Sequence, residues 1–183
     1  MPPPRIRRTE DLRLGRTSTP GARYFVTWCT HARRPSLTCQ RVLPKVKEAI
    51  VDLHGSDIEL LAATIMPDHI HLLFRLGSRL TLSQVAGKAK AAIHRRDSNL
   101  AWQENYFDRQ LRENETADGF AFYVFMNPYC ASLIDLNSTW AGWISSPTVR
   151  WKFEDSLRLG NLPQPEWLEQ AAGFGRDLPD GAE

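Results

Sequence analysis

Hydrophobic residues recur along the chain with two periods, and these periods predict the secondary structure. Alternation, or a short apolar run rich in β-branched and aromatic residues, is typical of a strand, whereas apolar residues spaced three and four apart are typical of a helix. The sequence predicts strands at 23–31, 58–66, 69–76 and 105–112. It predicts helices at 41–54, 82–96 and 115–127.

Turn-forming residues separate these elements. Only Pro67 and Asp68 lie between two of the strands, which predicts a hairpin, and Pro128 is expected to end the third helix because it disfavours helical backbone in the residue before it. The order of the elements favours an α+β fold, a ferredoxin-like antiparallel sheet with helices packed on one face. Order alone leaves other α+β layouts open.

The two ends of the chain differ in composition from its middle. Residues 1–22 contain five arginines, four prolines and two glycines without an apolar period, so we expect a flexible basic arm. Residues 23–150 hold the predicted elements. Residues 151–183 are expected to be a C-terminal extension that forms a loosely ordered tail. A length of 183 residues suits one domain with such additions.

Composition excludes several classes of protein. Hydrophobic residues make up 42% and charged residues 24% of the chain, so it can bury a core. No apolar run approaches the roughly 18 residues that a membrane span needs, and no export signal is readable, so we expect a cytoplasmic protein with no membrane partner. Three cysteines without CxxC spacing favour neither a disulfide framework nor a zinc knuckle.

The formal net charge of +2 hides an asymmetry between the two halves. Residues 1–98 hold 17 Lys and Arg against 8 Asp and Glu, whereas residues 99–183 hold 6 against 13. A basic first half is suited to binding a phosphate backbone. A solvated mixed surface is the alternative explanation.

The sharpest chemical feature is the sequence His69-Ile70-His71 in a predicted strand. Residues i and i+2 of a strand point to the same face, so both imidazoles are expected to project together on a solvent-facing side while Ile70 is buried on the other. Two convergent imidazoles can bind a metal ion. An HxH pair also occurs by chance on exposed strands, so the pattern alone is weak.

Tyr123 and Asn127 form a second feature, because residues four apart share one face of a helix. In one interpretation the tyrosine packs on the sheet and the asparagine is merely the last residue before Pro128. In the other, Tyr123 is a nucleophile and the amide oxygen of Asn127 completes a metal site.

Several ordered blocks of sequence resemble the REP-associated tyrosine transposases, a group within the single-tyrosine HUH transposases. The blocks are MPDHIHLLFRL (66–76), KAKAAIHRR (88–96), WQENYFDRQLR (102–112), YVFMNPYCASLI (123–134) and WISS (143–146). The resemblance runs from about Tyr24 to Ser146. Asp68 stands where many relatives have Asn, and Ser132 where a glycine is frequent.

This resemblance implies that residues 23–150 form a ferredoxin-like HUH catalytic domain. Such a domain cleaves and joins single-stranded DNA at hairpin-forming repeats through a 5′-phosphotyrosine intermediate. His69, His71 and Asn127 would be ligands of a divalent cation, and Tyr123 would be the nucleophile. A site of imidazoles and an amide oxygen suits Mg²⁺ or Mn²⁺ better than a structural Zn²⁺. The sequence leaves open whether the active unit is a monomer or a dimer.

Basic residues of the arm and of the second helix are the candidate contacts to DNA phosphates, with an aromatic residue nearby to stack on bases. These candidates are Arg5, Arg7, Arg8, Lys88, Lys90, Arg95, Arg96 and Trp102. Packing in the core is the alternative role for Trp102 and for the neighbouring Tyr106 and Phe107.

The leading hypothesis is therefore a strand-nicking and strand-transfer enzyme. A domesticated, non-catalytic module that binds repeat hairpins is the alternative from another class. A metal-dependent enzyme acting on small molecules would explain neither the basic half nor the later blocks.

Overall fold

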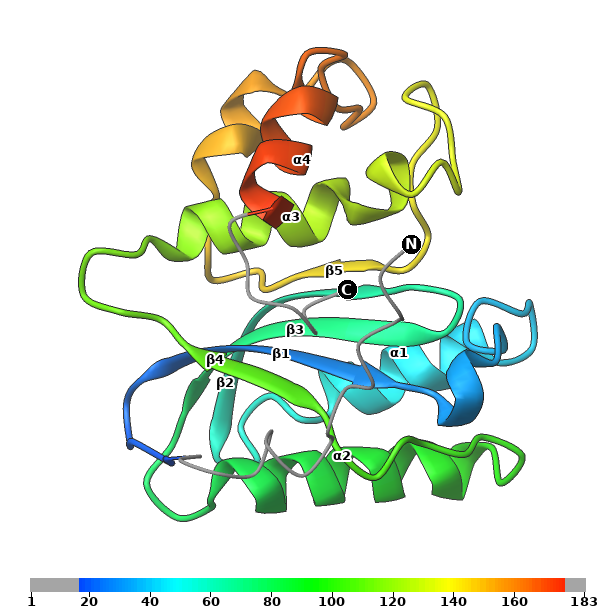
Figure 1. The fold of residues 1–183 in the computed structure, drawn as a ribbon, viewed down its shortest axis with the longest axis vertical. Helices are drawn as coiled ribbons and strands as arrows, with labels where there is room; N and C mark the ends of the chain where they lie inside the picture. Colours follow the sequence, from blue (N-terminus) through cyan, green and yellow to red (C-terminus); the bar gives the residue numbers. More distant parts are fainter. Residues whose placement is uncertain (1–16, 177–183) are drawn as a thin grey trace, which may run out of the picture.

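The structure is a computed structural model that describes residues 17–176 (Figure 1). Its strands are β1 (Arg23–Cys29), β2 (Ile58–Ile65), β3 (His69–Leu76), β4 (Phe107–Gln110) and β5 (Trp143–Ser145). Its helices are α1 (Leu43–Val51), α2 (Leu82–Arg96), α3 (Ala117–Cys130) and α4 (Trp167–Arg176), with 3-10 turns η2 (His31–Arg33) and η3 (Lys152–Ser156). None of the helices in this part of the chain has the length and apolar character to cross a membrane.

The five strands form one antiparallel sheet in the order β4-β1-β3-β2-β5. The predicted hairpin is confirmed, because β2 and β3 pair directly and the Met66 amide donates to the His69 carbonyl at 2.8 Å across the turn. Strand β3 is the central strand, with β1 on one side and β2 on the other. A residue of β3 therefore has a direct neighbour on both sides.

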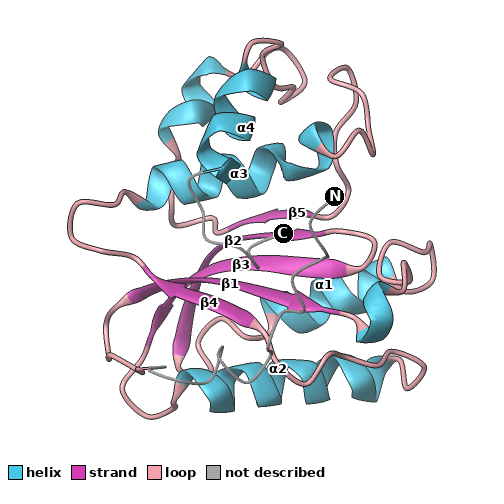
Figure 2. Cartoon of the chain, in the orientation of Figure 1, coloured by secondary structure: helices cyan, strands magenta, loops and turns pink. Residues whose placement is uncertain are grey.

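Helices cover both faces of the sheet (Figure 2). The predicted α+β class with an antiparallel sheet is confirmed. Helices α1 and α2 lie on one face of the sheet, where they pack on residues such as Val26 and Leu72. Helix α3 lies on the opposite face against Phe25 and Leu73, a second layer that the prediction did not include. The reason is that β2 and β3 are buried at nearly every position, so both of their faces need an apolar cover.

Helix α3 continues past the proline that was expected to end it. Pro128 lies inside the helix, and the last turn still forms because the Ala131 amide donates to the Asn127 carbonyl at 2.9 Å. The chain leaves the helix through Ser132, whose φ of 55° is the left-handed conformation that favours glycine. This backbone explains why a glycine would suit position 132.

The expectation of a loosely ordered tail over 151–183 is wrong for the part that the structure describes. Helix α4 packs on α3, and Trp167, 8% exposed, places its ring 5.3 Å from that of Phe122. Apolar residues spaced along α4 pack against the aromatic side chains of α3. This contact holds α4 in place, and the composition of the segment did not predict it. Residues 177–183, like residues 1–16 of the predicted arm, lie outside the described range.

Candidate active site

The two histidines stand at the start of the central strand and share one face of the sheet, as the alternation predicted. The expectation that they face solvent is wrong. His69 is 7% exposed and His71 is fully buried. The cause is α3, which covers this face of the sheet together with the aromatic residues it carries.

Each imidazole is held by a hydrogen bond at its Nδ1 atom. His69 Nδ1 lies 2.7 Å from Asp68 Oδ1, and His71 Nδ1 lies 2.9 Å from Thr27 Oγ1. The two Nε2 atoms consequently point toward each other and are 3.1 Å apart. The strand and its neighbours thus orient both rings so that their Nε2 atoms lie within hydrogen-bond distance of each other.

A carboxylate and an arginine set the electrostatics of the histidine pair. Asp68 forms an ion pair with Arg33 at 2.7 Å, and the hydrogen bond from His69 lowers the pKa of the Asp68 carboxyl below its ordinary value. Burial lowers the pKa of His71 well below its ordinary value, and the charges of His69 and Arg33 lower it further. His71 is therefore neutral at pH 7, the state in which a ring nitrogen can bind a cation.

The spacing of the two Nε2 atoms fits a shared cation. Two nitrogens that each lie about 2.1 Å from one ion are about 3 Å apart when they subtend a right angle, as neighbouring ligands of an octahedral ion do. Their observed separation is 3.1 Å. Residues 17–176 contain no group of three or more His, Cys, Asp and Glu that could hold a metal ion.

Tyr123 lies over the histidine pair on α3. Its ring centroid is 5.8 Å from that of His71 and 5.9 Å from that of Phe25, so sheet and helix meet at this tyrosine. Phe174 of α4 contacts the same ring at 5.7 Å, and Tyr123 as a whole is 4% exposed. Asn127 is half-buried one turn further along α3. The fold thus brings together His69, His71 and Tyr123, which are up to 54 positions apart in the sequence.

The candidate DNA contacts of α2 lie on the other face of the sheet, because α2 packs with α1. Lys88 and Arg95 are exposed there. Arg96 instead pairs with Glu48 and Asp52 of the neighbouring α1 region.

The remaining candidates of the described range have contacts within the protein. Lys90 donates to the Gln103 carbonyl at 2.8 Å. Trp102 packs against the core, and Tyr106 and Phe107 are buried in it, which agrees with the packing alternative. The arm residues Arg5, Arg7 and Arg8 precede the described residues.

Sequence reasoning missed the polar residues that surround the histidines. Thr27, Arg33 and Thr64 belong to no motif, and Asp68 stood out only as a turn residue and as a departure from the family pattern. A signal existed for the two threonines, since each is a polar residue with apolar neighbours on both sides in a predicted strand. Their relation to His71 depends on strand register, which the sequence does not display.

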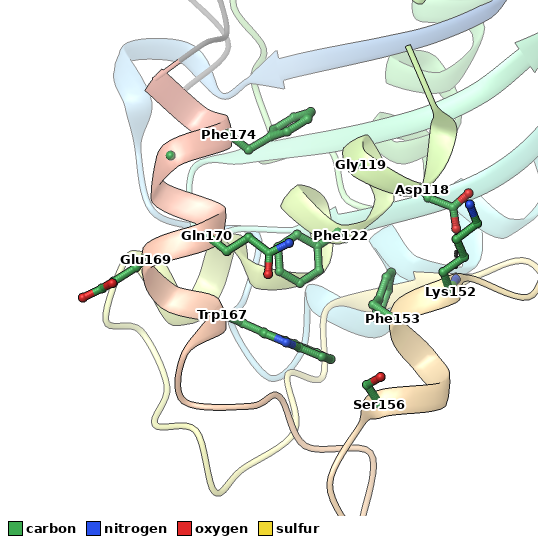
Figure 3. Close-up of a pocket in the computed structure, with 11 residues that line it drawn as sticks. Asp118, Gly119, Phe122, Lys152, Phe153, Ser156, Trp167, Glu169, Gln170 and Phe174 are labelled. Carbon is green, nitrogen blue, oxygen red and sulfur yellow. Dashed lines mark hydrogen bonds between the residues drawn. The ribbon is translucent and has the colours of Figure 1, made fainter. Parts of the chain in front are cut away.

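A separate pocket of about 600 Å³ lies between α3, η3 and α4 (Figure 3). Its walls include the aromatic residues Phe122, Phe153, Trp167 and Phe174. Phe174 also contacts the ring of Tyr123, and through it the pocket borders the candidate active site. Neither histidine lines this pocket.

Replacing Asp68 by alanine is expected to lower activity by about 10- to 100-fold, the usual cost of losing a partner that orients a ligating histidine. Alanine removes the carboxylate that binds both His69 and Arg33. Single-turnover cleavage of a labelled oligonucleotide measures the effect. Asp97→Ala is a matched control, because Asp97 binds Lys45 and the backbone amide of Asn99 instead. Equal activity of wild type and Asp68→Ala would contradict the orienting role.

The five-stranded antiparallel sheet of this α+β domain thus carries the paired histidines on its central strand and faces the tyrosine of the covering helix. The chain belongs to the family described as "Transposase IS200 like", which matches it over residues 18–118. The matched range includes His69 and His71 and ends before Tyr123 and Asn127. The resemblance noted from the sequence blocks is thereby confirmed for the family.

Comparison with solved structures gives matches that include two transposases. One is a REP-associated tyrosine transposase bound to a REP hairpin, with 20% identity, a TM-score of 0.60, and coverage of 70% of this chain and 79% of that chain, and it has the same fold. The other is a putative transposase from Deinococcus radiodurans R1, with 23% identity, a TM-score of 0.45, and coverage of 55% and 87%. No curated protein matches the chain.

Proposed function

We propose that this transposase cleaves and joins single-stranded DNA at hairpin-forming repeats, with Tyr123 as the nucleophile and His69, His71 and Asn127 as the ligands of Mg²⁺ or Mn²⁺. The observation that carries the proposal is the packing of the Tyr123 ring against His71, with 5.8 Å between the centroids, beside His69, whose Nε2 lies 3.1 Å from that of His71. The structural relative bound to a REP hairpin supports the choice of substrate.

The residue types suit phosphodiester chemistry. The phenolic oxygen of Tyr123 attacks the phosphorus, the bond to the 3′-oxygen breaks, and the products are a 5′-phosphotyrosine and a free 3′-hydroxyl. The phenol loses its proton as it attacks, and the departing 3′-oxygen gains one. Because the phosphotyrosine retains a phosphodiester bond, a 3′-hydroxyl can reverse the step and join a new strand without ATP.

The residues around Tyr123 would bind the cation and orient the groups that hold it. His69 and His71 would hold the cation, which would stabilise negative charge on the non-bridging oxygens of a phosphate. Asp68 and Thr27 hold the rings in place through their Nδ1 atoms. Since Tyr123 is 4% exposed, the reaction requires its ring or the covering Phe174 to move. This enclosure is the observation that favours the alternative, a domesticated module that binds repeat hairpins without cleaving them.

The test uses a labelled single-stranded repeat hairpin from the genome that encodes the protein, incubated with full-length protein and Mn²⁺. We expect a covalent adduct on a denaturing gel, and binding that weakens steeply from low to physiological salt because phosphate contacts dominate. An unstructured strand of the same composition is the control. Salt-sensitive binding without any adduct would support the domesticated module, and the absence of both would refute the proposal.

A further inference from the structure

Thr64 lies beside the histidine pair and has no role in the site described so far. It stands on β2 directly opposite His71, as Thr27 does on β1. Directly opposed residues of antiparallel strands share a face of the sheet and place their Cβ atoms about 4.5–5.5 Å apart. The imidazole of His71 is therefore flanked by a threonine on each side.

The two threonines differ in their hydrogen bonds. Thr27 Oγ1 is bonded to His71 Nδ1 at 2.9 Å, whereas Thr64 Oγ1 is buried without a hydrogen-bond partner among the described residues. Thr64 is fully buried, so bulk water does not compensate for the missing bond. A hydroxyl in this state costs free energy, and such groups in folded proteins usually bind a water, an ion or a ligand.

The surroundings of Thr64 offer no structural reason for a hydroxyl. Its neighbours in the strand are Ala62, Ala63 and Ile65, and a valine would fill the same volume without an unsatisfied polar atom. Two other buried polar groups without partners in the described part of the chain, the indole nitrogens of Trp28 and Trp102, belong to the α1 and α2 side of the sheet. Thr64 lies instead on the face that carries both histidines.

We propose that the Thr64 hydroxyl donates a hydrogen bond to an oxygen atom that occupies the His69 and His71 site, either a water or a non-bridging oxygen of the substrate phosphate. The inference rests on the proposed function. Thr64 then acts as a positioning residue from β2, while Thr27 orients the His71 ring from β1. The hydroxyl finds in the ligand the partner that the protein does not supply.

Thr64→Val tests this inference. A hydroxyl that binds an oxygen atom in the histidine site and a hydroxyl that binds nothing there predict different outcomes for this variant. The variant removes an unpartnered hydroxyl and adds a methyl group, so the Tm of the metal-free protein should stay the same or rise. Binding of Mn²⁺, cleavage of the hairpin strand, or both should weaken by about 10- to 100-fold, as for other residues that support a metal site. Thr64→Ser keeps the hydroxyl and should recover most of the loss.

Thr30→Val provides the matched comparison for stability. The Thr30 hydroxyl donates to backbone carbonyls, with Arg34 O at 2.9 Å and Asp68 O at 3.0 Å, so its removal should lower the Tm.

Calorimetric titration with Mn²⁺ in the absence of DNA identifies the acceptor of the hydrogen bond from Thr64. Weaker Mn²⁺ binding by Thr64→Val indicates a water, whereas unchanged Mn²⁺ binding with slower cleavage indicates a phosphate oxygen.

Two results would overturn the inference. Wild-type Mn²⁺ affinity together with wild-type cleavage in Thr64→Val would show that the hydroxyl is passive. A fall in Tm equal to that of Thr30→Val would show that the hydroxyl has a partner inside the protein. If the wild type binds Mn²⁺ but forms no adduct, the proposed function fails while the Mn²⁺ comparison still decides the role of Thr64. A wild type that neither binds Mn²⁺ nor cleaves would overturn both.

Discussion

Replacing Tyr123 by phenylalanine is expected to eliminate the covalent adduct between protein and DNA and to leave hairpin binding intact. The substitution removes the attacking oxygen and keeps the ring that packs between Phe25, His71 and Phe174. Loss of the nucleophile should lower adduct formation by about 10³-fold or more. Loss of one buried hydroxyl should change the free energy of unfolding by only about 1 kcal/mol.

The other three tyrosines provide matched controls on the same denaturing gel. Tyr24 donates to the Thr17 carbonyl at 3.1 Å, Tyr106 shares a hydrogen bond with Ser83 at 3.3 Å, and Tyr129 donates to the Ser138 carbonyl at 3.0 Å. Each of these hydroxyls has a structural partner, so each change to phenylalanine should leave the adduct in place. An adduct that survives in Tyr123→Phe and disappears in one of the controls would assign the nucleophile elsewhere.

Removal of either histidine is expected to abolish Mn²⁺-dependent cleavage, with a loss of about 10³-fold or more, since each supplies one of two converging nitrogens. Burial makes the two substitutions unequal in their effect on stability. His71→Ala removes a fully buried ring together with its bond to Thr27, and should destabilise the fold by about 2–4 kcal/mol. His69→Ala should cost less, because this ring lies at the edge of the site.

The stability effect has to be separated from the catalytic effect. His71→Gln keeps a polar side chain of similar size, and thermal unfolding of each variant shows whether the assay temperature lies below its Tm. His54→Ala, at an exposed turn, is the control for loss of a histidine. Cleavage by the wild type in the presence of EDTA, or by the double variant His69→Ala/His71→Ala, would show that the reaction does not need a metal ion bound by these histidines.

Local rules determined much of what the sequence alone could predict. Alternation placed His69 and His71 on one face, the two-residue spacing of 67–68 predicted the hairpin, and helical spacing aligned Tyr123 with Asn127. These relations span only a few residues along the backbone. They follow from strand and helix geometry, and the strand alternation and the hairpin are seen in the structure.

Tertiary structure decided everything that depends on contacts between distant segments. The burial of both histidines follows from α3 packing on their face of the sheet, and the order of α4 follows from its contact with α3. The placement of Thr27 and Thr64 beside His71 follows from strand register. Register and layer order depend on which apolar surfaces bury one another, and such pairing between segments leaves no periodic signal in either segment alone.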